Sequence, residues 1–337
     1  MIRRMPARAA AAPRAAATSR RPPPPPPREP SPVEAVLEAI GGAVGLAGSA
    51  LGLAGGAVDA VAAQLIALDR ELRDKLERIP TALNEFGYDP FGFNPDAARR
   101  ALLGSALLYR YWFRVETHGI DHLPPGRVLL IGNHGGQIAL DGAMIGVACV
   151  LEAEPPRIIR GMGEYWLPTV PWVNLVMVRT GSVVGTPRNC VELLERGECV
   201  IAFPEGVRGM NKTFWERYQL KEFGQGFMRL ALETDTPIVP VAVVGAEEQY
   251  PGLANLAGVG RLLGMPAFPV TPFWPLLGPL GAVPLPTKYR IYFGEPLHFA
   301  GDPNDEDEVI AEKVDLVKSR IAGMIAQGLA ARRSWFF

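Results

Sequence analysis

One histidine and one acid that follows it are the first sign of chemistry in this chain. His134 comes after an apolar run, Val128 to Ile131, with the pattern of a strand buried on both faces. Asp141 follows with six residues between, among them Gly135 and Gly136. A histidine oriented by a carboxylate is the minimum equipment for removing a proton from a hydroxyl. The alternative is a strand-to-helix turn whose side chains only satisfy backbone groups.

Two later apolar runs also end in residues of interest. The strand-like run Glu198 to Phe203 leads into a turn that contains Glu205 and Arg208, where Pro204 and Gly206 allow a sharp bend. A third run, Pro237 to Gly245, reads as a strand interrupted by Pro240. Open α/β sheets bind their ligands at the carboxyl ends of strands, which is where Asn133 and His134 are expected.

In this order, the three stretches resemble the glycerolipid acyltransferase family, which includes lysophosphatidate acyltransferases. That family carries Asn-His with a downstream Asp, then Phe-Pro-Glu-Gly-Thr-Arg, then a Val-Pro-Val strand. The resemblance covers roughly Phe113 to Pro296. Val207 replaces the usual Thr, and the gap between His134 and Asp141 is wider than in the family. No other acid lies between His134 and Glu152, so a local carboxylate partner has to be Asp141.

The resemblance implies an α/β fold with a mixed, mostly parallel sheet flanked by helices, preceded by a helical, membrane-associating region. The expected domains are a disordered Arg/Ala/Pro-rich tail (1–31), the helical region (32–112), the acyltransferase domain (113–330) and a basic-aromatic tail (331–337). Within the catalytic domain the pattern predicts strands at Phe113 to Thr117, Arg157 to Arg160, Gly181 to Val184 and Lys288 to Gly294. Helices are predicted at Asp141 to Leu151, Gly224 to Leu232 and Asn304 to Ala326.

The family also suggests roles for individual residues. His134 would be the base and Asp141 the group that fixes its tautomer, with the oxyanion held by amides near Gly135, Gly136 or the Glu205 turn. The family's second motif, Gly then Arg, matches Gly181 and Arg188 best, with Arg179 as the competitor and a surface salt bridge as the alternative. The expected substrate-binding residues are therefore Arg188, Glu205, Gly206, Arg208, Arg179 and Lys221.

The implied reaction is acyl transfer from an acyl thioester, acyl-coenzyme A or acyl carrier protein, to a lipid hydroxyl. The first choice of acceptor is a lysophospholipid such as 1-acylglycerol-3-phosphate, in glycerolipid biosynthesis. A neutral acceptor such as diacylglycerol or a fatty alcohol is the alternative, followed by an acyl-thioester hydrolase and a non-catalytic lipid-binding protein. Neither motif contains Ser or Cys, so a covalent acyl-enzyme is not suggested. No cofactor and no metal is expected.

The composition of the chain further limits the classes of protein that it could belong to. The chain has 337 residues, 48% of them hydrophobic and 20% charged, enough for a large core. A net charge of -1 gives no reason to expect nucleic acid as a partner. Three Cys without metal-like spacing fit a reducing setting. His118 and His122 are four apart, but the glycine and prolines around them predict a turn rather than a metal site.

Several segments predict membrane contact, so we expect a protein bound to the cytoplasmic face of a membrane. Ala39 to Val58 is uncharged and glycine-rich, and is either one spanning helix or a helix packed on the protein or interface. Ala62 to Arg78 predicts an amphipathic helix with a leucine stripe that packs on the core or contacts the membrane, and Pro80 ends it. Met265 to Pro286 predicts a lid or membrane-facing segment, and Arg332 to Phe337 an interfacial tail with a frayed terminus as the alternative.

Overall fold

The structure is a computed structural model that describes residues 55–169, 173–262, 264 and 267–337. The predicted tail 1–31 and most of the segment Ala39 to Val58 lie outside the described residues. The chain divides into two compact units, Met1–Ile66 and Ala67–Phe337. All candidate site residues belong to the second unit, which is described below. In the described part of the chain, no helix has both the length and the apolar character that crossing a bilayer requires.

A seven-stranded sheet forms the centre of this unit, in the order β1-β9-β6-β2-β5-β3-β4. Strands β6, β2, β5, β3 and β4 run parallel, whereas β9 is antiparallel to β6 and parallel to β1. The predicted mixed, mostly parallel sheet is therefore confirmed. The bounds are β1 Glu116–His118, β2 Val128–Gly132, β3 Ile159–Gly163, β4 Val183–Val184, β5 Cys199–Ala202, β6 Ile238–Val244 and β9 Arg290–Phe293.

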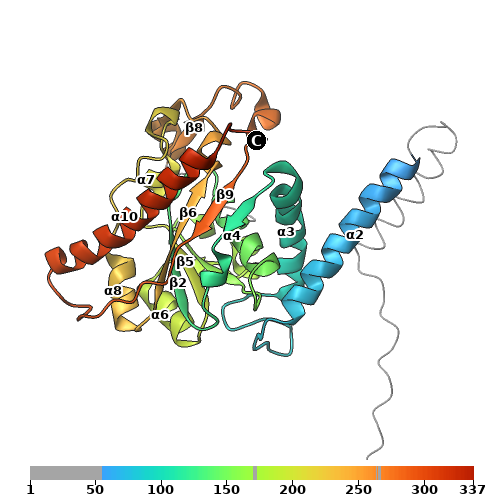
Figure 1. The fold of residues 1–337 in the computed structure, drawn as a ribbon. Coiled ribbons are helices and arrows are strands. Elements are labelled where there is room, and N and C mark those ends of the chain that lie inside the picture. Colours follow the sequence, from blue (N-terminus) through green and yellow to red (C-terminus); the bar gives the residue numbers. More distant parts are fainter. Residues whose placement is uncertain (1–54, 170–172, 263, 265–266) are drawn as a thin grey trace, which may run out of the picture. The chain divides into compact units, whose positions relative to one another are not determined.

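Strand β2 is buried on both faces because it lies inside the sheet and helices cover both sides (Figure 1). Val128 and Leu130 belong to one apolar cluster, while the alternate residues Leu129 and Ile131 belong to the other. The first cluster includes residues of α2 (Gly55–Glu77), α3 (Pro95–Leu107) and α4 (Leu140–Leu151). The second includes residues of α6 (Pro187–Glu195), α8 (Gly226–Glu233) and α10 (Asp307–Ala331).

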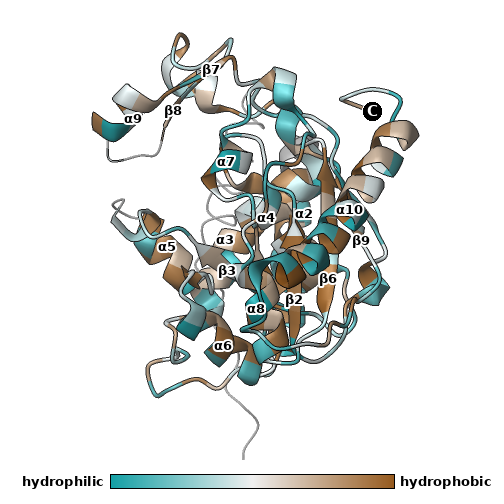
Figure 2. Ribbon diagram, turned by 90° about the vertical axis from the view of Figure 1, so that its left-hand side faces the viewer, coloured by the Kyte–Doolittle hydropathy of each residue, from teal (hydrophilic) through white to brown (hydrophobic). Residues whose placement is uncertain are grey.

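The remaining elements are short and lie in connections. They are α5 (Val173–Arg179), α7 (Val207–Met210), α9 (Ala257–Leu262), the hairpin β7 (Ala254–Leu256) with β8 (Phe268–Val270), a π-helix at Leu108–Trp112, and 3-10 helices at Ile120–His122, Leu167–Thr169, Phe214–Glu216, Ala246–Glu248 and Gly278–Ala282. Figure 2 shows the hydrophobic strands β2 and β6 in the interior, with α5 and the β7–β8 hairpin projecting from one side.

Two helices begin directly after a residue that is suited to cap a helix. The Asn94 side chain accepts a hydrogen bond from the Ala97 amide at 2.9 Å, and the Thr186 hydroxyl accepts from the Asn189 amide at 3.1 Å. Each helix has proline at its first turn, where the missing N–H leaves no bond unmade. Each such cap contributes roughly 0.5–2 kcal/mol to helix stability.

Other predicted bounds need correction. Phe113 to Val115 are not in a strand, and β1 begins at Glu116; likewise β3 begins at Ile159 rather than Arg157. The helical segment that begins with α3 changes its geometry at its last turn, near Tyr111. The chain forms a π-helical turn there, with the Phe113 amide donating to the Leu108 carbonyl at 2.7 Å. That turn buries Tyr109 and leaves Tyr111 exposed.

Pro240 is tolerated within an inner strand because its ring nitrogen faces a gap in the ladder. The Pro240 carbonyl accepts from the Gly294 amide at 2.8 Å, so the nitrogen of the same residue faces the same neighbour. On that side regular pairing with β9 begins only at Val241, after an isolated bridge between Ile238 and Leu297. No ladder bond is lost to the missing N–H.

Candidate active site

The carboxyl ends of three adjacent strands bring the candidate residues together. Ile131 of β2 pairs with Ala202 of β5 on one side and with Pro240 of β6 on the other. Three loops therefore start at one edge of the sheet: 133–139 after β2, 203–206 after β5 and 245–249 after β6. The expectation that polar groups gather at the strand ends is confirmed by this arrangement.

Asn133 fixes the start of the loop that carries His134. Its side-chain amide donates to the Val243 carbonyl at 3.1 Å, and its side-chain oxygen accepts from the Val243 amide at 2.8 Å. The side chain thus continues the pairing between β2 and β6 beyond the last backbone ladder bond. Asn133 is buried, so loss of either bond would leave a backbone group unpaired.

His134 and Asp141 are in direct contact. The His134 Nδ1 atom lies 2.8 Å from Oδ2 of Asp141, which is fully buried in the first turn of α4. The Asp141 carboxylate also accepts from the Gly135 amide at 3.1 Å and the Gly142 amide at 2.8 Å. With N–H donors on both oxygens, this carboxylate assigns the ring proton to Nδ1. Nε2 is then an acceptor, and it has no partner among the residues described; His134 is 7% exposed.

The wide His134–Asp141 gap is absorbed by a tightly coiled turn. The Ile138 amide donates to the Gly136 carbonyl and the Leu140 amide to the Ile138 carbonyl, both at 2.7 Å. Two successive three-residue turns of this kind shorten the path to α4. Gly136 has φ +85°, and an added Cβ would lie 2.3 Å from the Ala246 carbonyl oxygen. Glycine is therefore required at position 136 by backbone conformation and by space.

Phe203 and Glu205 support His134 from the β5 side. The imidazole stacks on the Phe203 ring, with centroids 4.2 Å apart and planes inclined by 14°. The His134 amide donates to Glu205 Oε1 at 3.0 Å. The other Glu205 oxygen accepts from the Lys221 amide at 2.8 Å and from Lys212 Nζ at 3.3 Å. Gly206 follows with φ +56° and is the N-cap residue of α7.

A buried group of one cation and two carboxylates lies beneath the histidine loop. Lys212 Nζ lies 2.8 Å from Glu247 Oε1 as well as 3.3 Å from Glu205, and all three side chains are buried. Burial raises the pKa of Glu247 to about 7, against the opposing effect of Lys212. One lysine cannot neutralise two buried carboxylates, so Glu247 binds a proton near neutral pH. An added Cβ at Gly135 would lie 2.5 Å from Glu247 Cγ, which places this group directly against the loop.

The next two residues of the β6 loop are also held. Glu248 pairs with Arg332 at 2.6 Å and accepts from the Tyr218 hydroxyl. Burial raises the pKa of Tyr218 well above its ordinary value, with the Glu248 charge adding to the effect. Gln249 donates to the Gly136 carbonyl at 3.1 Å and accepts from the Tyr289 hydroxyl at 2.6 Å. Arg332 at the end of α10 and Tyr289 just before β9 thus support the β6 loop next to His134.

The predicted substrate-binding residues are not all in this network. Arg208 is exposed and donates to Glu222, while Arg179 donates to the Tyr88 hydroxyl at 2.5 Å and lies over its ring. Arg188 is exposed at the start of α6 and makes no ion pair or hydrogen bond within the described ranges. Lys221 contributes its backbone amide, because its side chain pairs with Glu216 at 2.6 Å.

Two expectations differ from the structure. Glu205 is predicted to position the acceptor, but it is 1% exposed and both of its oxygens accept from protein N–H groups. Its geometry is that of a support for His134. Gly135 is predicted as an oxyanion donor, but its amide is already bonded to Asp141. Gly136 remains a candidate, because its amide has no partner in the part of the chain that the structure describes.

Sequence reasoning missed the roles of Phe203, Lys212 and Gln249. The stacking of Phe203 and the pairing of Lys212 with Glu247, 35 residues away, have no local signal. The sequence signal that could have indicated these residues is their position in the chain. Glu247 and Gln249 follow β6, which lies beside β2 in the sheet.

Other polar groups of the molecule serve local structure. His118 stacks on Tyr292 and His122 Nε2 lies 3.0 Å from Glu295, so these two histidines have separate partners. Across the described ranges, no three His, Cys, Asp or Glu side chains are grouped so that they could hold a metal ion. Cys149, Cys190 and Cys199 are buried free thiols, and burial raises the pKa of Cys190 to about 11 and that of Cys199 to about 12. Such thiols are poor nucleophiles.

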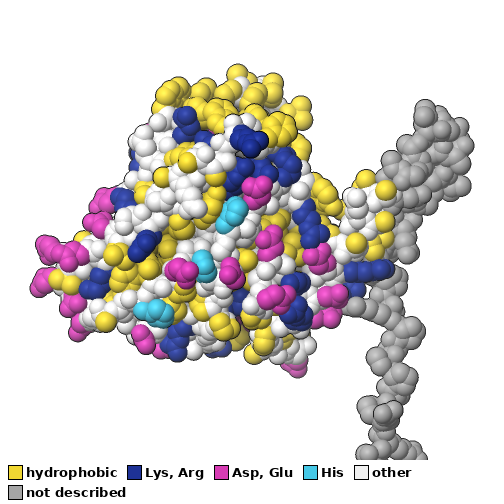
Figure 3. Space-filling model, in the orientation of Figure 1, with side chains coloured by type: hydrophobic (Ala, Val, Ile, Leu, Met, Phe, Trp, Pro, Cys, Tyr) yellow, Lys and Arg dark blue, Asp and Glu magenta, His cyan; other side chains and the backbone are white. Residues whose placement is uncertain are grey.

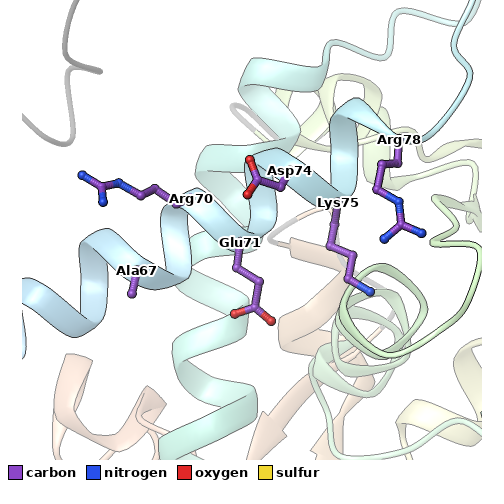
Figure 4. A pocket seen from close by; sticks show the side chains of 6 residues that line it. All are labelled: Ala67, Arg70, Glu71, Asp74, Lys75 and Arg78. Carbon is purple, nitrogen blue, oxygen red and sulfur yellow. The ribbon is translucent and has the colours of Figure 1, made fainter.

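A surface hollow on α2 has no connection to the site. Figure 4 shows its six lining side chains: Ala67, Arg70, Glu71, Asp74, Lys75 and Arg78. Lys75 and Arg78 pair with Glu154 at 2.7 and 2.5 Å, and Glu71 pairs with Arg110 at 2.7 Å. Three of the lining charges thus pair with residues outside the hollow, and the lining shares no residue with the loops around His134.

Comparison with known proteins assigns the family. The family model described as Acyltransferase matches residues 114–244. An uncharacterized protein of Mycobacterium leprae is 39% identical over 282 residues, which are 82% of this chain and 76% of that protein. This protein therefore belongs to the glycerolipid acyltransferase family, as the sequence predicts.

More distant relatives differ in what their names describe. The "1-acyl-sn-glycerol-3-phosphate acyltransferase alpha" of Homo sapiens is 28% identical over 150 residues, 43% of this chain and 50% of that protein. The "DGAT1/2-independent enzyme synthesizing storage lipids" of Mus musculus is 25% identical over 202 residues, 60% of this chain and 57% of that protein. Among solved structures, the lysophosphatidate acyltransferase PlsC of Thermotoga maritima aligns with a TM-score of 0.44 and 19% identity, over 70% of this chain and 81% of that one.

Proposed function

We propose that this protein transfers an acyl chain from an acyl thioester to the hydroxyl of a lipid. The observation that carries the proposal is the state of His134. Asp141 holds the ring proton on Nδ1, and Nε2 is left as an acceptor at the carboxyl edge of the sheet. A hydroxyl within hydrogen-bond distance of Nε2 would be activated for attack.

The proposed reaction needs one base and no covalent intermediate. Nε2 of His134 takes the proton of the acceptor hydroxyl while its oxygen forms a bond to the thioester carbonyl carbon. The tetrahedral intermediate then collapses, the C–S bond breaks, and the imidazolium returns the proton to the leaving thiolate. Asp141 stabilises the imidazolium between these steps. The Gly136 amide is the candidate donor to the oxyanion. The donor is either acyl-coenzyme A or acyl carrier protein, with no further cofactor.

The first choice of acceptor is a lysophospholipid such as 1-acylglycerol-3-phosphate. Arg208 lies three residues after Glu205, its side chain is 59% exposed, and its carboxylate partner Glu222 is exposed as well. A guanidinium in this state can exchange its surface partner for a phosphate. The name of the human relative describes the same acceptor.

A neutral acceptor is the second candidate. Arg179, one of the predicted substrate-binding residues, is engaged by Tyr88 through both a hydrogen bond and its ring face. The mouse relative, whose name describes storage-lipid synthesis, matches more of this chain than the human acyltransferase does. Diacylglycerol or a fatty alcohol would then accept the acyl chain.

Product analysis by mass spectrometry tests the proposal. The full chain would be incubated with long-chain acyl-coenzyme A and a pool of lysophosphatidate, lysophosphatidylcholine, diacylglycerol and a fatty alcohol. H134A is the test variant, and H298A, which changes a histidine in the loop after β9, is the matched control. Phosphatidate formed by the parent and H298A but not by H134A supports the first choice. Triacylglycerol or wax ester supports the second, while free fatty acid alone means a hydrolase.

A substitution at Arg208 distinguishes between the two candidate acceptors. We expect R208A to raise the KM for lysophosphatidate about ten-fold, because a charge-assisted contact is lost, and to leave the KM for the acyl donor unchanged. R196A, which removes an exposed arginine paired with Glu192, is the control. Equal effects of R208A on both substrates would remove Arg208 from phosphate recognition.

A further inference from the structure

The segment between β6 and β9 exposes a group of large apolar side chains. This insert, residues 251–286, contains β7, α9, β8 and the 3-10 helix Gly278–Ala282. Its exposed apolar residues include Leu262, Phe273, Leu276, Leu277, Leu280 and Val283. Leu276 and Leu280 are 83% and 75% exposed. Figure 3 shows hydrophobic side chains gathered at the top of the molecule, where Figure 1 places β8. A gathered apolar surface of this kind indicates an interaction site.

The charged residues of this part of the sequence all have the same sign. From Gln249 to Gly294 the sequence contains no Asp or Glu, and its three cations are Arg261, Lys288 and Arg290. Lys288 and Arg290 pair with Glu116 at 2.5 and 3.0 Å, whereas Arg261 is exposed beside Leu262. An apolar surface with cations and no acids is complementary to an anionic lipid layer. A second copy would bring the same sign of charge to the contact.

The C-terminal tail lies against the base of the insert. The Lys288 amide donates to the Trp335 carbonyl at 2.8 Å. Arg114 donates to the carbonyls of Pro286 at 2.7 Å and Phe336 at 2.9 Å. Phe337 is exposed at the end of this tail, which also contains Arg333. Aromatic rings and cations together are the side chains favoured at a bilayer interface.

The base of the insert also contacts the loops of the candidate site. The Phe214 amide donates to the Gly252 carbonyl at 2.8 Å, and the Leu285 amide to the Gln249 carbonyl at 2.8 Å. An added Cβ at Gly252 would lie 2.5 Å from Gln137 Nε2, in the turn between His134 and Asp141. The exposed leucines and the histidine loop are thus joined through a few hydrogen-bonded residues.

We propose that the insert and the C-terminal tail form one surface that docks onto an anionic lipid bilayer. The exposed leucines enter the apolar layer, and Arg261 and Arg333 contact anionic head groups. Docking by this surface places the interface next to the loops that carry His134. The proposal concerns binding, and it holds or fails whatever reaction the site performs.

Vesicle flotation of the full chain tests this surface. The vesicles are phosphatidylcholine alone and an equal mixture of phosphatidylcholine and phosphatidylglycerol. The test variant is L276D/L280D. The matched control is V309D/L316D, which places the same two acids on α10 at residues that are 40% and 44% exposed. We expect the parent and the control to bind the anionic vesicles, and L276D/L280D to bind about ten-fold more weakly, because two apolar anchors become charges.

R261E/R333E refines the test. This variant should lose binding to the anionic vesicles at low salt, with a smaller difference from the parent at high salt, because salt screens exposed charges. Thermal melts check that all variants are folded. Equal binding by L276D/L280D and V309D/L316D would overturn the proposal, as would a parent that binds neither vesicle. A parent dimer that L276D/L280D converts to a monomer without loss of vesicle binding would assign the surface to a second copy instead.

Discussion

The carboxyl edge of the sheet and the insert after β6 distribute their side chains in opposite ways. The edge buries charged groups: Asp141, Glu205, Lys212 and Glu247 are all nearly inaccessible. The insert exposes leucines and contains no acid. Folding alone favours neither arrangement, because burying charge and exposing apolar surface both oppose it.

The difference shows that the side chains of these two regions are arranged for function rather than for folding. At the edge, each buried charge has hydrogen-bonded partners, and the network ends at the backbone and ring of His134. The arrangement determines the position of one imidazole. In the insert, the exposed leucines add little to the fold, so their arrangement is explained by what they contact outside it. The following changes test this contrast, from the largest expected effect to the smallest.

Replacing Asp141 should have the largest effect. In D141N an N–H₂ group replaces one carboxylate oxygen and faces N–H groups that were bonded to it, so the Nδ1 tautomer is no longer enforced. We expect the rate of acyl transfer to fall about 10²–10⁴-fold, the range associated with positioned proton transfer. Steady-state kinetics below the melting temperature gives the result. D315N, at an exposed position on α10, should behave as the parent; a similar loss in both would separate Asp141 from catalysis.

Replacing Lys212 should affect the stability of the fold rather than a single step of the reaction. K212M leaves the buried Glu205 and Glu247 without their shared cation, and we expect it to lower the free energy of unfolding by about 3–5 kcal/mol at pH 8. K221M is the matched control, because the Lys221–Glu216 pair is at the surface and contributes at most about 1 kcal/mol. Urea unfolding of both variants makes the comparison. If K221M were as destabilising as K212M, the buried network would not be the support inferred above.

Glu247 should make stability depend on pH. Its pKa is raised by burial to about 7, so between its ordinary value of 4.5 and 7 the folded chain binds a proton that the unfolded chain has released. The free energy of unfolding should therefore fall as pH rises through this window, by up to about 3 kcal/mol. E247Q removes the titrating group and should flatten this part of the curve. An unchanged slope in E247Q, measured by urea unfolding from pH 5 to 8, would assign the dependence to other groups.

Shortening the exposed leucines should have the smallest effect on the fold. L276A and L280A should each change the free energy of unfolding by no more than about 0.5 kcal/mol, as expected for surface positions. L129A, in the buried strand β2, should lower it by about 2–5 kcal/mol. Thermal melts of the three variants give the contrast directly. A large loss in L276A would mean that the insert packs as core.

Much of the fold follows from local sequence patterns. The inner strands β2, β5 and β6 are apolar runs, and the caps Asn94 and Thr186 act on amides three residues ahead. The pairing of His134 with Asp141 was also predictable, since no other acid lies nearby in the chain. Local pattern could not place the strand ends, because β1 and β3 begin where partner strands allow pairing.

Contacts between residues that are far apart in the sequence could not be predicted from local patterns. The sequence around Glu205 does not distinguish a residue that binds a substrate from one that supports His134. The structure gives it the second geometry, because the chain from Gly209 to Lys221 folds over it. Lys212 and Glu247 form a pair because β5 and β6, which precede them in the chain, both lie beside β2.

The sequence by itself determined the inner strands β2, β5 and β6, the two capped helix starts, the pairing of His134 with Asp141 and the family, because these depend on short-range periodicity, hydrogen bonds and motif order. Tertiary structure alone decided which charges are buried together and which leucines face outward. The physical reason is that burial depends on neighbours supplied by distant segments: the same Glu is a ligand in solvent and a support in the interior, and the same Leu is core under a helix and an anchor on a surface.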